Sequence, residues 1–166
     1  MGFIPKEDRL VLMLALKNGN SVNALFSRRM LQAMLKSMGE KLASTSPTAS
    51  RTPDPHEVLQ MEHIAAVTSR KPEATGSVTA GETDWYITEV QMETRDNFLV
   101  LGLKGELRNP TGPDGTTAEP VAALQLERSQ AHQILRMLKG QADQAGWGLE
   151  LPADWMRPME YGRGGD

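Results

Sequence analysis

The sequence contains no cysteine, which excludes disulfide bonds, thiolate metal sites and cysteine nucleophiles. A chain without cysteine fits a reducing compartment, and we expect a cytoplasmic location. Long hydrophobic runs are also missing, because the apolar run from Leu10 to Leu16 is far shorter than the ~20 residues that span a bilayer. The N-terminus MGFIPKEDR carries acids where a secretion signal would carry bases. We therefore expect no signal peptide, no membrane anchor and no membrane partner.

Residues that carry chemistry are scarce. The three histidines are His56, His63 and His132, and none lies at a metal-ligand spacing in a convincing context. His56 and His63 would lie near one face of a predicted helix, and we interpret them as ordinary surface or half-buried residues. The chain has no Gly-rich phosphate loop before a helix and no G-x-S-x-G, H-E-x-x-H or Ser-x-x-Lys motif. The sequence thus predicts no metal, no cofactor and no catalytic residue, although a site assembled only by folding would leave no motif.

Charge is unevenly distributed along the 166 residues, a length typical of one domain. The net charge is −3, which argues against a dedicated nucleic-acid binder. Residues 1–42 hold seven Lys or Arg against three acids, a net +4, and the remainder holds 11 against 18, a net −7. We interpret this asymmetry as attraction between a basic first part and an acidic remainder. A basic patch for an anionic partner is the alternative.

Two segments of the chain, 9–42 and 96–142, resemble each other. Leu12 in the first corresponds to Leu99 in the second, an offset of 87, and Met34 corresponds to Ile134, an offset of 100. The change of offset indicates extra residues in a loop at 105–120, where the sequence RNPTGPDGTTAEP is rich in turn formers. The similarity predicts an internal duplication of a β-β-α unit.

The first unit, residues 1–42, shows strand and helix patterns in turn. Apolar side chains at both parities predict an interior strand over 9–17, and Asn18-Gly19 favours a type I′ hairpin turn into a strand over 21–26. Ser27 is a suitable N-cap for a helix over 28–42. The helix stripe consists of Leu31, Met34, Leu35, Met38 and Leu42.

Residues 43–83 read as a linker with a short helix over 55–67, for which Asp54-Pro55 is a typical start, although alternation there also fits a strand. The second unit, 84–159, has an extra leading strand over 85–92, whose counterpart in the first unit would be 2–4. Strands over 98–104 and 121–126 and a helix over 129–145 follow. We expect Gly102 to mark a bulge or a close neighbour, Gly146 to end the helix, the apolar tail to fold back on the core, and 160–166 to be frayed.

These patterns predict one compact α+β domain. An antiparallel sheet would carry two similar amphipathic helices on one face, related by a pseudo-two-fold axis, with the short linker helix beside them. Alternatively, each unit would complete its sheet with the equivalent unit of a second chain.

The predicted function is a non-enzymatic protein-protein interaction module: an adaptor, an inhibitor or a self-assembling subunit. The partner would be another protein or a second copy in a homodimer, bound at a sheet edge, at the loop 105–120 or on a helix surface. Candidate partner-binding residues are Arg28, Arg29, Met30, Trp85, Tyr86 and Trp155. One alternative is binding of single-stranded nucleic acid on sheet aromatics, which the acidic neighbours of those aromatics disfavour. A small enzyme is the other.

Overall fold

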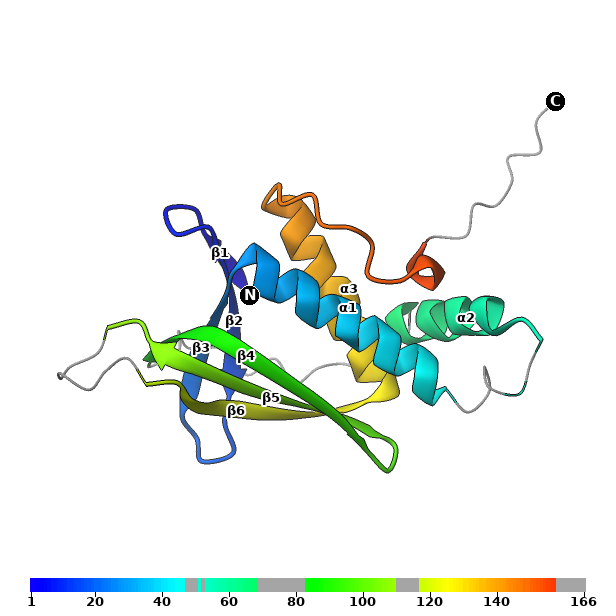
Figure 1. Ribbon diagram of the computed structural model, residues 1–166, viewed down its shortest axis with the longest axis horizontal. Coiled ribbons are helices and arrows are strands. Elements are labelled where there is room, and N and C mark those ends of the chain that lie inside the picture. The colour runs from blue at the N-terminus through cyan, green and yellow to red at the C-terminus, as the bar shows by residue number, and fades with distance from the viewer. Residues whose placement is uncertain (47–50, 52, 69–82, 110–116, 158–166) are drawn as a thin grey trace.

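The computed structural model describes residues 1–46, 51, 53–68, 83–109 and 117–157. This part of the chain is α+β, as predicted, and consists of a six-stranded mixed sheet and three α-helices (Figure 1). The strands are β1 (Gly2–Ile4), β2 (Arg9–Ala15), β3 (Ser21–Phe26), β4 (Thr83–Arg95), β5 (Phe98–Leu107) and β6 (Glu119–Glu127). The helices are α1 (Arg28–Thr45), α2 (Pro55–Thr68) and α3 (Arg128–Gln144), and a short 3₁₀ turn, η2 (Asp154–Met156), follows in the tail.

The strands lie in the sheet in their order along the chain, β1 to β6. All neighbouring pairs are antiparallel except β3 and β4, which are parallel. The expectation of a wholly antiparallel sheet was therefore wrong. A two-fold axis that keeps both helices on one face is perpendicular to the sheet, and it would make equivalent strands antiparallel. The equivalent strands β2 and β5 instead run in the same direction. The predicted pseudo-two-fold relation is wrong for the same reason, since the two sets of strands follow one another side by side.

The β2–β3 hairpin forms where Asn18-Gly19 predicted it, but with a different turn. The Gly19 N–H donates to the Leu16 carbonyl at 3.1 Å, and the Leu16 N–H donates to the Asn20 carbonyl at 2.7 Å. Gly19 has a φ of 87°, while Asn18 is not left-handed, so the type I′ prediction was wrong. The connection is a type I turn with a left-handed glycine bulge, which needs positive φ at one residue only.

Gly105, rather than Gly102, is the glycine that the sheet requires. The pairing of β4 with β5 shifts register between Ile87 and Glu89, and a Cβ on Gly105 would lie 2.3 Å from the Tyr86 carbonyl oxygen. Gly102 has only ordinary contacts with Gln91, so the expectation of a bulge or a close neighbour there was wrong. A glycine at 105 lets the two backbones approach at the bulge.

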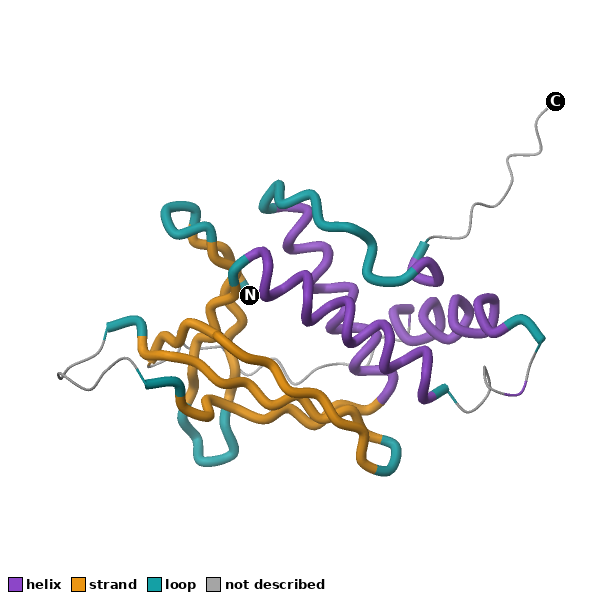
Figure 2. Tube along the Cα trace, in the orientation of Figure 1, coloured by secondary structure: helices purple, strands orange, loops and turns teal. Residues whose placement is uncertain are grey.

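One core lies between the sheet and the helices. Alternate residues of β5 are buried, and the predicted stripe of α1 is buried from Leu31 to Leu42. In α3, Ala131, Leu135, Leu138 and Ala142 are buried in the same cluster, so both helices contribute to one apolar interior. Figure 2 shows the three helices gathered above the strands, with the tail running over them.

Local signals predicted several ends of elements correctly. Ser27 Oγ accepts the Met30 N–H at 3.2 Å, and Asp54 Oδ1 accepts the Glu57 N–H at 3.2 Å at the start of α2, which is a helix. Gly146 has a φ of 74°, and the Trp147 N–H donates to the Ala142 carbonyl at 3.0 Å. This pattern is a Schellman ending, and it brings Trp147 into the core.

Other elements are longer than predicted, because a strand extends as long as a neighbouring strand can pair with it. β5 continues to Leu107 and β6 starts at Glu119, so the connection is shorter than the predicted 105–120. Similarly, β4 covers 83–95 rather than 85–92, and α1 continues to Thr45. Much of the predicted linker, the middle of the β5–β6 connection and the frayed end at 160–166 lie outside the described residues.

Candidate functional site

Two of the three histidines meet inside the helical layer. His63 of α2 and His132 of α3 are buried, and their Nδ1 atoms lie 3.0 Å apart. His132 Nε2 lies 3.1 Å from Oε1 of Glu62, the residue before His63. The same Glu62 oxygen accepts a hydrogen bond from Arg128 Nε at 2.7 Å. We call these four residues, Glu62, His63, Arg128 and His132, the helix relay.

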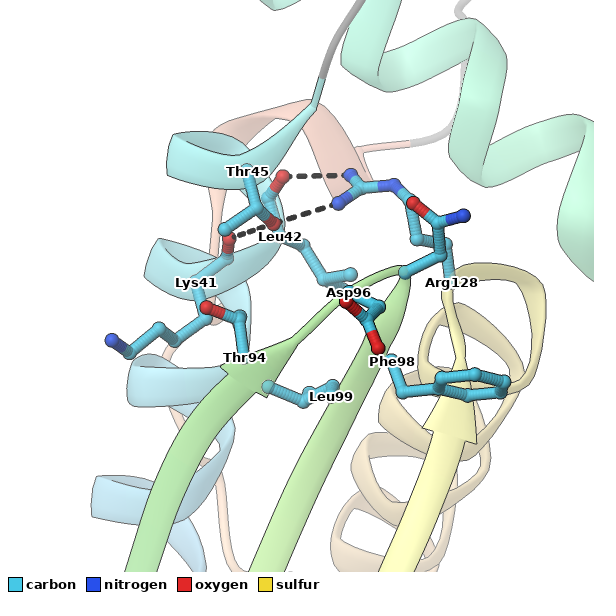
Figure 3. Close-up of a pocket in the computed structure, with 9 residues that line it drawn as sticks. Lys41, Leu42, Thr45, Thr94, Asp96, Phe98, Leu99 and Arg128 are labelled. Carbon is cyan, nitrogen blue, oxygen red and sulfur yellow. Dashed lines mark hydrogen bonds between the residues drawn. The ribbon is translucent and has the colours of Figure 1, made fainter.

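Arg128 anchors the relay to the end of α1. Its two terminal nitrogens donate to the Thr45 hydroxyl and to the Leu42 carbonyl, each at 2.7 Å (Figure 3). The Leu42 carbonyl is one of the last of the helix, which otherwise lack hydrogen-bond partners, and a cation there also suits the helix dipole. One guanidinium therefore ties α1 to the Glu62 carboxylate on α2. Glu62 is held further by the Ser46 hydroxyl, which donates to its Oε2 at 3.1 Å.

With both histidines neutral, the ionised Glu62 fixes the direction of every hydrogen bond in the relay. A carboxylate only accepts, so His132 must donate from Nε2. When both rings are neutral, His132 Nδ1 is then a lone pair, and it accepts the Nδ1–H of His63. The remaining ring nitrogen, His63 Nε2, is left unprotonated. No hydrogen bond joins this nitrogen to another described residue.

The protonation of these groups follows from their surroundings. Burial opposes ionisation of Glu62, but hydrogen bonds from His132 and Arg128 outweigh it and lower its pKa to about 2. Burial lowers the pKa of His63 to about 4, helped by the charges of His132 and Arg136. The relay therefore holds a carboxylate at one end and a neutral imidazole at the other over a wide range of pH.

Trp155 closes the relay on its tail side. Its ring meets the edges of His63 and His132, with centroids 5.3 and 5.2 Å away and planes inclined by 67° and 75°. Trp155 is 5% exposed, so the tail covers the histidine pair instead of leaving it open to solvent. An aromatic lid of this kind lowers the local dielectric, which strengthens the hydrogen bonds beneath it.

His63 also lines a hollow between α2, α3 and the tail, which we call the tail groove. Its volume is about 440 Å³. The apolar lining consists of Ile64, Val67, Gly140, Leu151 and Met156. The ionisable lining consists of His63, Arg136, Lys139, Asp143 and Arg157. Lys139 pairs with Asp143, and no described residue forms an ion pair with Arg136.

A second hollow of about 440 Å³ lies at the other end of the relay, between the end of α1 and the β4–β5 turn (Figure 3). Lys41, Thr45, Asp96, Phe98 and Arg128 are among its lining residues. The guanidinium of Arg128 is fully occupied by its protein partners. This hollow therefore offers Lys41 and Asp96, of opposite charge, and lacks the cationic surplus of the tail groove.

A different polar group lies on the opposite face of the sheet and consists of Glu7, Asp84, Tyr86 and Arg108; we call it the sheet cluster. Arg108 donates to Glu7 Oε1 at 2.8 Å and to Asp84 Oδ2 at 2.9 Å, and the Tyr86 hydroxyl donates to Glu7 Oε1 at 3.3 Å. Hydrogen bonds to Asp84 and Glu7 raise the pKa of Arg108 further. Glu7 Oε2 is buried and has no partner in the described part.

The residues predicted on the first helix divide into paired and free ones. Arg28 forms an ion pair with Asp8 at 2.7 Å and lies over the Trp147 ring. An acid of the same chain therefore balances its charge. The hydrogen bond from Arg28 lowers the pKa of Asp8. Arg29 is exposed, and no described acid pairs with it. Met30 is half-buried and packs against the core.

The aromatic candidates lie in three different environments. Trp85 is half-buried, packs against the core and donates from Nε1 to Thr83 at 3.1 Å. Its neighbour Tyr86 faces the other side of the sheet, where the guanidinium of Arg9 lies 5.0 Å from its ring. Trp155 is buried against the relay. The fold does not bring these three side chains together.

Ion pairs between residues 1–42 and the rest of the chain do not account for the charge asymmetry in the way predicted. Among the ion pairs between described residues, none joins a cation of residues 1–42 to an acid beyond them. The long-range pair runs the other way, from Arg108 to Glu7. No ion pair between described residues therefore supports that interpretation, which stays a prediction.

Sequence reasoning did not find the helix relay. Glu62 and His63 are adjacent, and Arg128 and His132 are four apart on α3, so each helix presents one acid or base beside a histidine. The i,i+4 spacing was the available signal for the α3 pair. Nothing in the sequence indicated that α2 would lie against α3, and this packing creates the site.

The chain matches no family model, no curated protein and no solved structure. None of the helices in the described ranges is long and apolar enough to cross a membrane. The same ranges contain no group of three or more His, Asp or Glu side chains that could hold a metal ion.

Proposed function

We propose that the protein is an interaction module whose tail groove binds an acidic, amphipathic segment of another protein. This keeps the predicted class of function and assigns it to a helix surface instead of a sheet edge or the β5–β6 connection. The observation that carries the proposal is a concave surface with both apolar walls and a surplus of positive charge, in a chain whose net charge is −3.

Apolar contact is the first element of support. The large apolar side chains exposed on the described surface are Met61, Met137 and Leu151, with exposed fractions of 57, 49 and 37%. Of these, Leu151 lines the groove, whereas Met61 and Met137 belong to α2 and α3 and lie outside its lining. Met156 and Leu151 line the groove together with Ile64 and Val67, and methionine is flexible and polarisable, so this apolar lining can adapt to the side chains of a partner helix or strand.

Charge is the second element. Of the groove's cations, Lys139 and Arg157 have acidic partners, Asp143 and Asp154, while Arg136 is exposed and has none among the described residues. An anionic group on the bound segment would provide that partner and would steer the encounter. The occupant is therefore acidic as well as apolar.

Nucleic acid binding on the sheet has less support. A stacking platform needs aromatic rings on one face, but the consecutive Trp85 and Tyr86 face opposite sides, and Tyr86 is engaged with Glu7 and Arg9. The groove's cations lie on the helical side, away from the outer face of the sheet.

The test uses the intact chain as bait in a lysate of the source cell, followed by hydrogen exchange on the purified complex. We expect one partner to be retained by the wild type and lost in Arg136→Glu, with slower amide exchange at 61–68, 136–143 and 151–157. Retention alone would not support the proposal, because the site must also be located.

Arg29→Glu is the matched control, since it reverses the charge of another exposed arginine, on α1. It should retain the partner. Loss of the partner in Arg29→Glu but not in Arg136→Glu would contradict the proposal and would favour the α1 surface. Protection confined to β1 or β6, the edges of the sheet, would do the same.

The internal duplication remains part of the proposal. Three strands and a helix, β1–β3 with α1, are followed by three strands and a helix, β4–β6 with α3, which supports reuse of one unit. In this view α2 and the tail are additions outside the repeat, and the tail groove lies where these additions meet α3.

A further inference from the structure

We propose that the inner end of the tail groove is a subsite for a phosphoryl group carried by the bound ligand, held by Arg136 and His63 Nε2. This inference rests on the proposed function, because it names the acidic group that the groove binds. His63 is only 5% exposed, and its Nδ1 is bonded to His132. Its other ring nitrogen, Nε2, has no hydrogen-bond partner among the described residues.

When both histidines are neutral, the relay makes this nitrogen an acceptor. Glu62 fixes the proton on His132 Nε2, His132 Nδ1 then accepts the proton of His63 Nδ1, and His63 Nε2 keeps its lone pair. A ligand that fits must therefore present a donor to His63 and, at the same time, negative charge to Arg136.

Phosphate monoesters meet both demands and carboxylates do not. Near their second pKa of about 6, phosphate monoesters carry one acidic O–H and two charge-bearing oxygens. The O–H can donate to His63 Nε2 while the other oxygens accept from Arg136. A carboxylate at the same pH only accepts, so it would place a lone pair against the lone pair of the ring.

The groups around His63 are compatible with one shared proton. On α2 the neighbouring acid is Glu62, and on α3 the ring faces His132, with Arg136, Lys139 and Asp143 along the same groove. The tail supplies the neutral Trp155 and the cation Arg157. Burial is the main reason that the empty His63 stays neutral, and the charge of Arg136 contributes. A bound anion offsets the charge of Arg136, so one proton can be shared between the phosphoryl oxygen and the ring.

The first experiment compares inorganic phosphate with sulfate on the full chain at pH 6, by NMR titration. The two ions have the same shape, but sulfate carries no proton at this pH. We expect phosphate to bind at least about tenfold more tightly than sulfate, a difference of about 1.4 kcal/mol. Equal binding of the two ions would overturn the phosphoryl subsite while leaving the groove proposal intact.

Two variants of His63 separate its nitrogens. His63→Asn keeps an amide N–H near the position of Nδ1, facing His132, and removes Nε2, so it should lose the preference for phosphate and keep sulfate binding. His63→Gln places its amide near the position of Nε2 and should retain part of the preference. A preference unchanged in His63→Asn would overturn the assignment, and thermal unfolding checks that both variants are folded.

The direction in which the affinity for phosphate changes with pH is an independent test. A purely cationic site binds the dianion better, so its affinity for phosphate would rise between pH 6 and 8. The proposed site needs the shared proton, so its affinity should fall over that range by up to about tenfold per pH unit once the ligand is fully deprotonated. A rise would contradict the proposal.

The source of the phosphoryl group is resolved by two capped amino acids. N-acetyl-O-phosphoserine methylamide should bind more tightly than inorganic phosphate if the group is carried on a protein segment, because its backbone also contacts the apolar walls. The glutamate counterpart should bind at least about tenfold more weakly than phosphoserine. Equal binding of glutamate and phosphoserine would reject the phosphoryl subsite, whereas loss of the partner in Arg136→Glu is a separate result that tests the groove.

Discussion

The sheet cluster and the helix relay are both built on an arginine between acceptors, yet they end differently. Arg108 binds Glu7 and Asp84, two acids on neighbouring parts of the sheet, and its charge is matched within the cluster. Arg128 binds one acid, Glu62, and uses its other nitrogens on the end of α1. The relay then continues through two histidines, the second of which, His63, lines the tail groove. The first network ties the β1–β2 connection to β4 and to the end of β5, and the second connects the fold to a surface.

Removal of Arg128 should be the most damaging change. Arg128→Met leaves the Glu62 carboxylate without its arginine partner and removes two hydrogen bonds at the end of α1. The side chains of Arg128 and Glu62 are only 25 and 26% exposed. We expect the free energy of unfolding to fall by about 3 kcal/mol, measured by urea denaturation at pH 7. Arg95→Met removes an exposed pair with Glu93 and is the control, with an expected loss below about 0.5 kcal/mol. Similar losses in both variants would contradict the role of the relay.

Gly105→Ala tests the backbone that positions Tyr86 in the sheet cluster. A Cβ at 105 would meet the Tyr86 carbonyl oxygen at 2.3 Å, so the β4–β5 bulge must shift. We expect a loss of about 2 kcal/mol in urea unfolding, in the range of other overpacking changes. Gly102→Ala, which meets only ordinary contacts, should change stability by less than about 0.5 kcal/mol. The two substitutions compare one chemical change at two positions of the same strand.

Stability should depend on pH through the relay. The pKa of His63 is about 4 in the folded state and 6.5 ordinarily, so the unfolded chain binds the proton first as pH falls. Stability from the neutral ring is complete above pH 6.5 and is lost as pH falls from 6.5 to 4. We expect a loss of about 1 to 2 kcal/mol between pH 7 and 4.5, and His63→Gln should flatten this part of the curve.

Glu62 acts in a lower window. Its pKa is about 2 in the folded state and 4.5 ordinarily, so its contribution is present above pH 4.5 and is lost as pH falls from 4.5 to 2. A single transition below pH 4.5, with a flat profile above it, would show that His63 is not held neutral by the fold.

The smallest effect is expected in the sheet cluster. Arg108→Met leaves Glu7 and Asp84 without their shared cation, but the Tyr86 hydroxyl still donates to Glu7 and the Asn23 amide still donates to Asp84. A loss of about 1 kcal/mol is expected, and it should shrink in high salt. A loss larger than that of Arg128→Met would reverse the comparison between the two networks.

The sequence predicted the elements of this fold better than their arrangement. Local chemistry was enough for the cap at Ser27, the start of α2 at Asp54 and the left-handed Gly146, because each involves neighbours in the chain. The parallel pairing of β3 with β4 joins segments separated by α1 and α2, and no local pattern encodes it. Sequence periodicity alone therefore could not predict the order of the strands in the sheet.

The site was even harder to predict from the sequence than the arrangement of the strands. His63 and His132 are 69 positions apart, and Glu62 and Arg128 are 66 apart, so only the packing of α2 on α3 brings them together. The same applies to Gly105, whose requirement comes from a bulge in the opposite strand. Residues chosen for exposure or aromaticity proved to be distributed over separate surfaces and the core.

The most direct test of the account is the protonation of His63 itself, observed by long-range ¹H–¹⁵N correlation NMR of histidine-labelled protein from pH 4 to 8. The relay predicts an Nδ1–H tautomer of His63 with an unprotonated Nε2 at pH 7 and a pKa below 5. Addition of phosphate at pH 6 should shift the resonance of Nε2 toward the protonated form, and sulfate should shift it less. A proton on Nε2 at pH 7, or a pKa at or above the ordinary 6.5, would contradict the account.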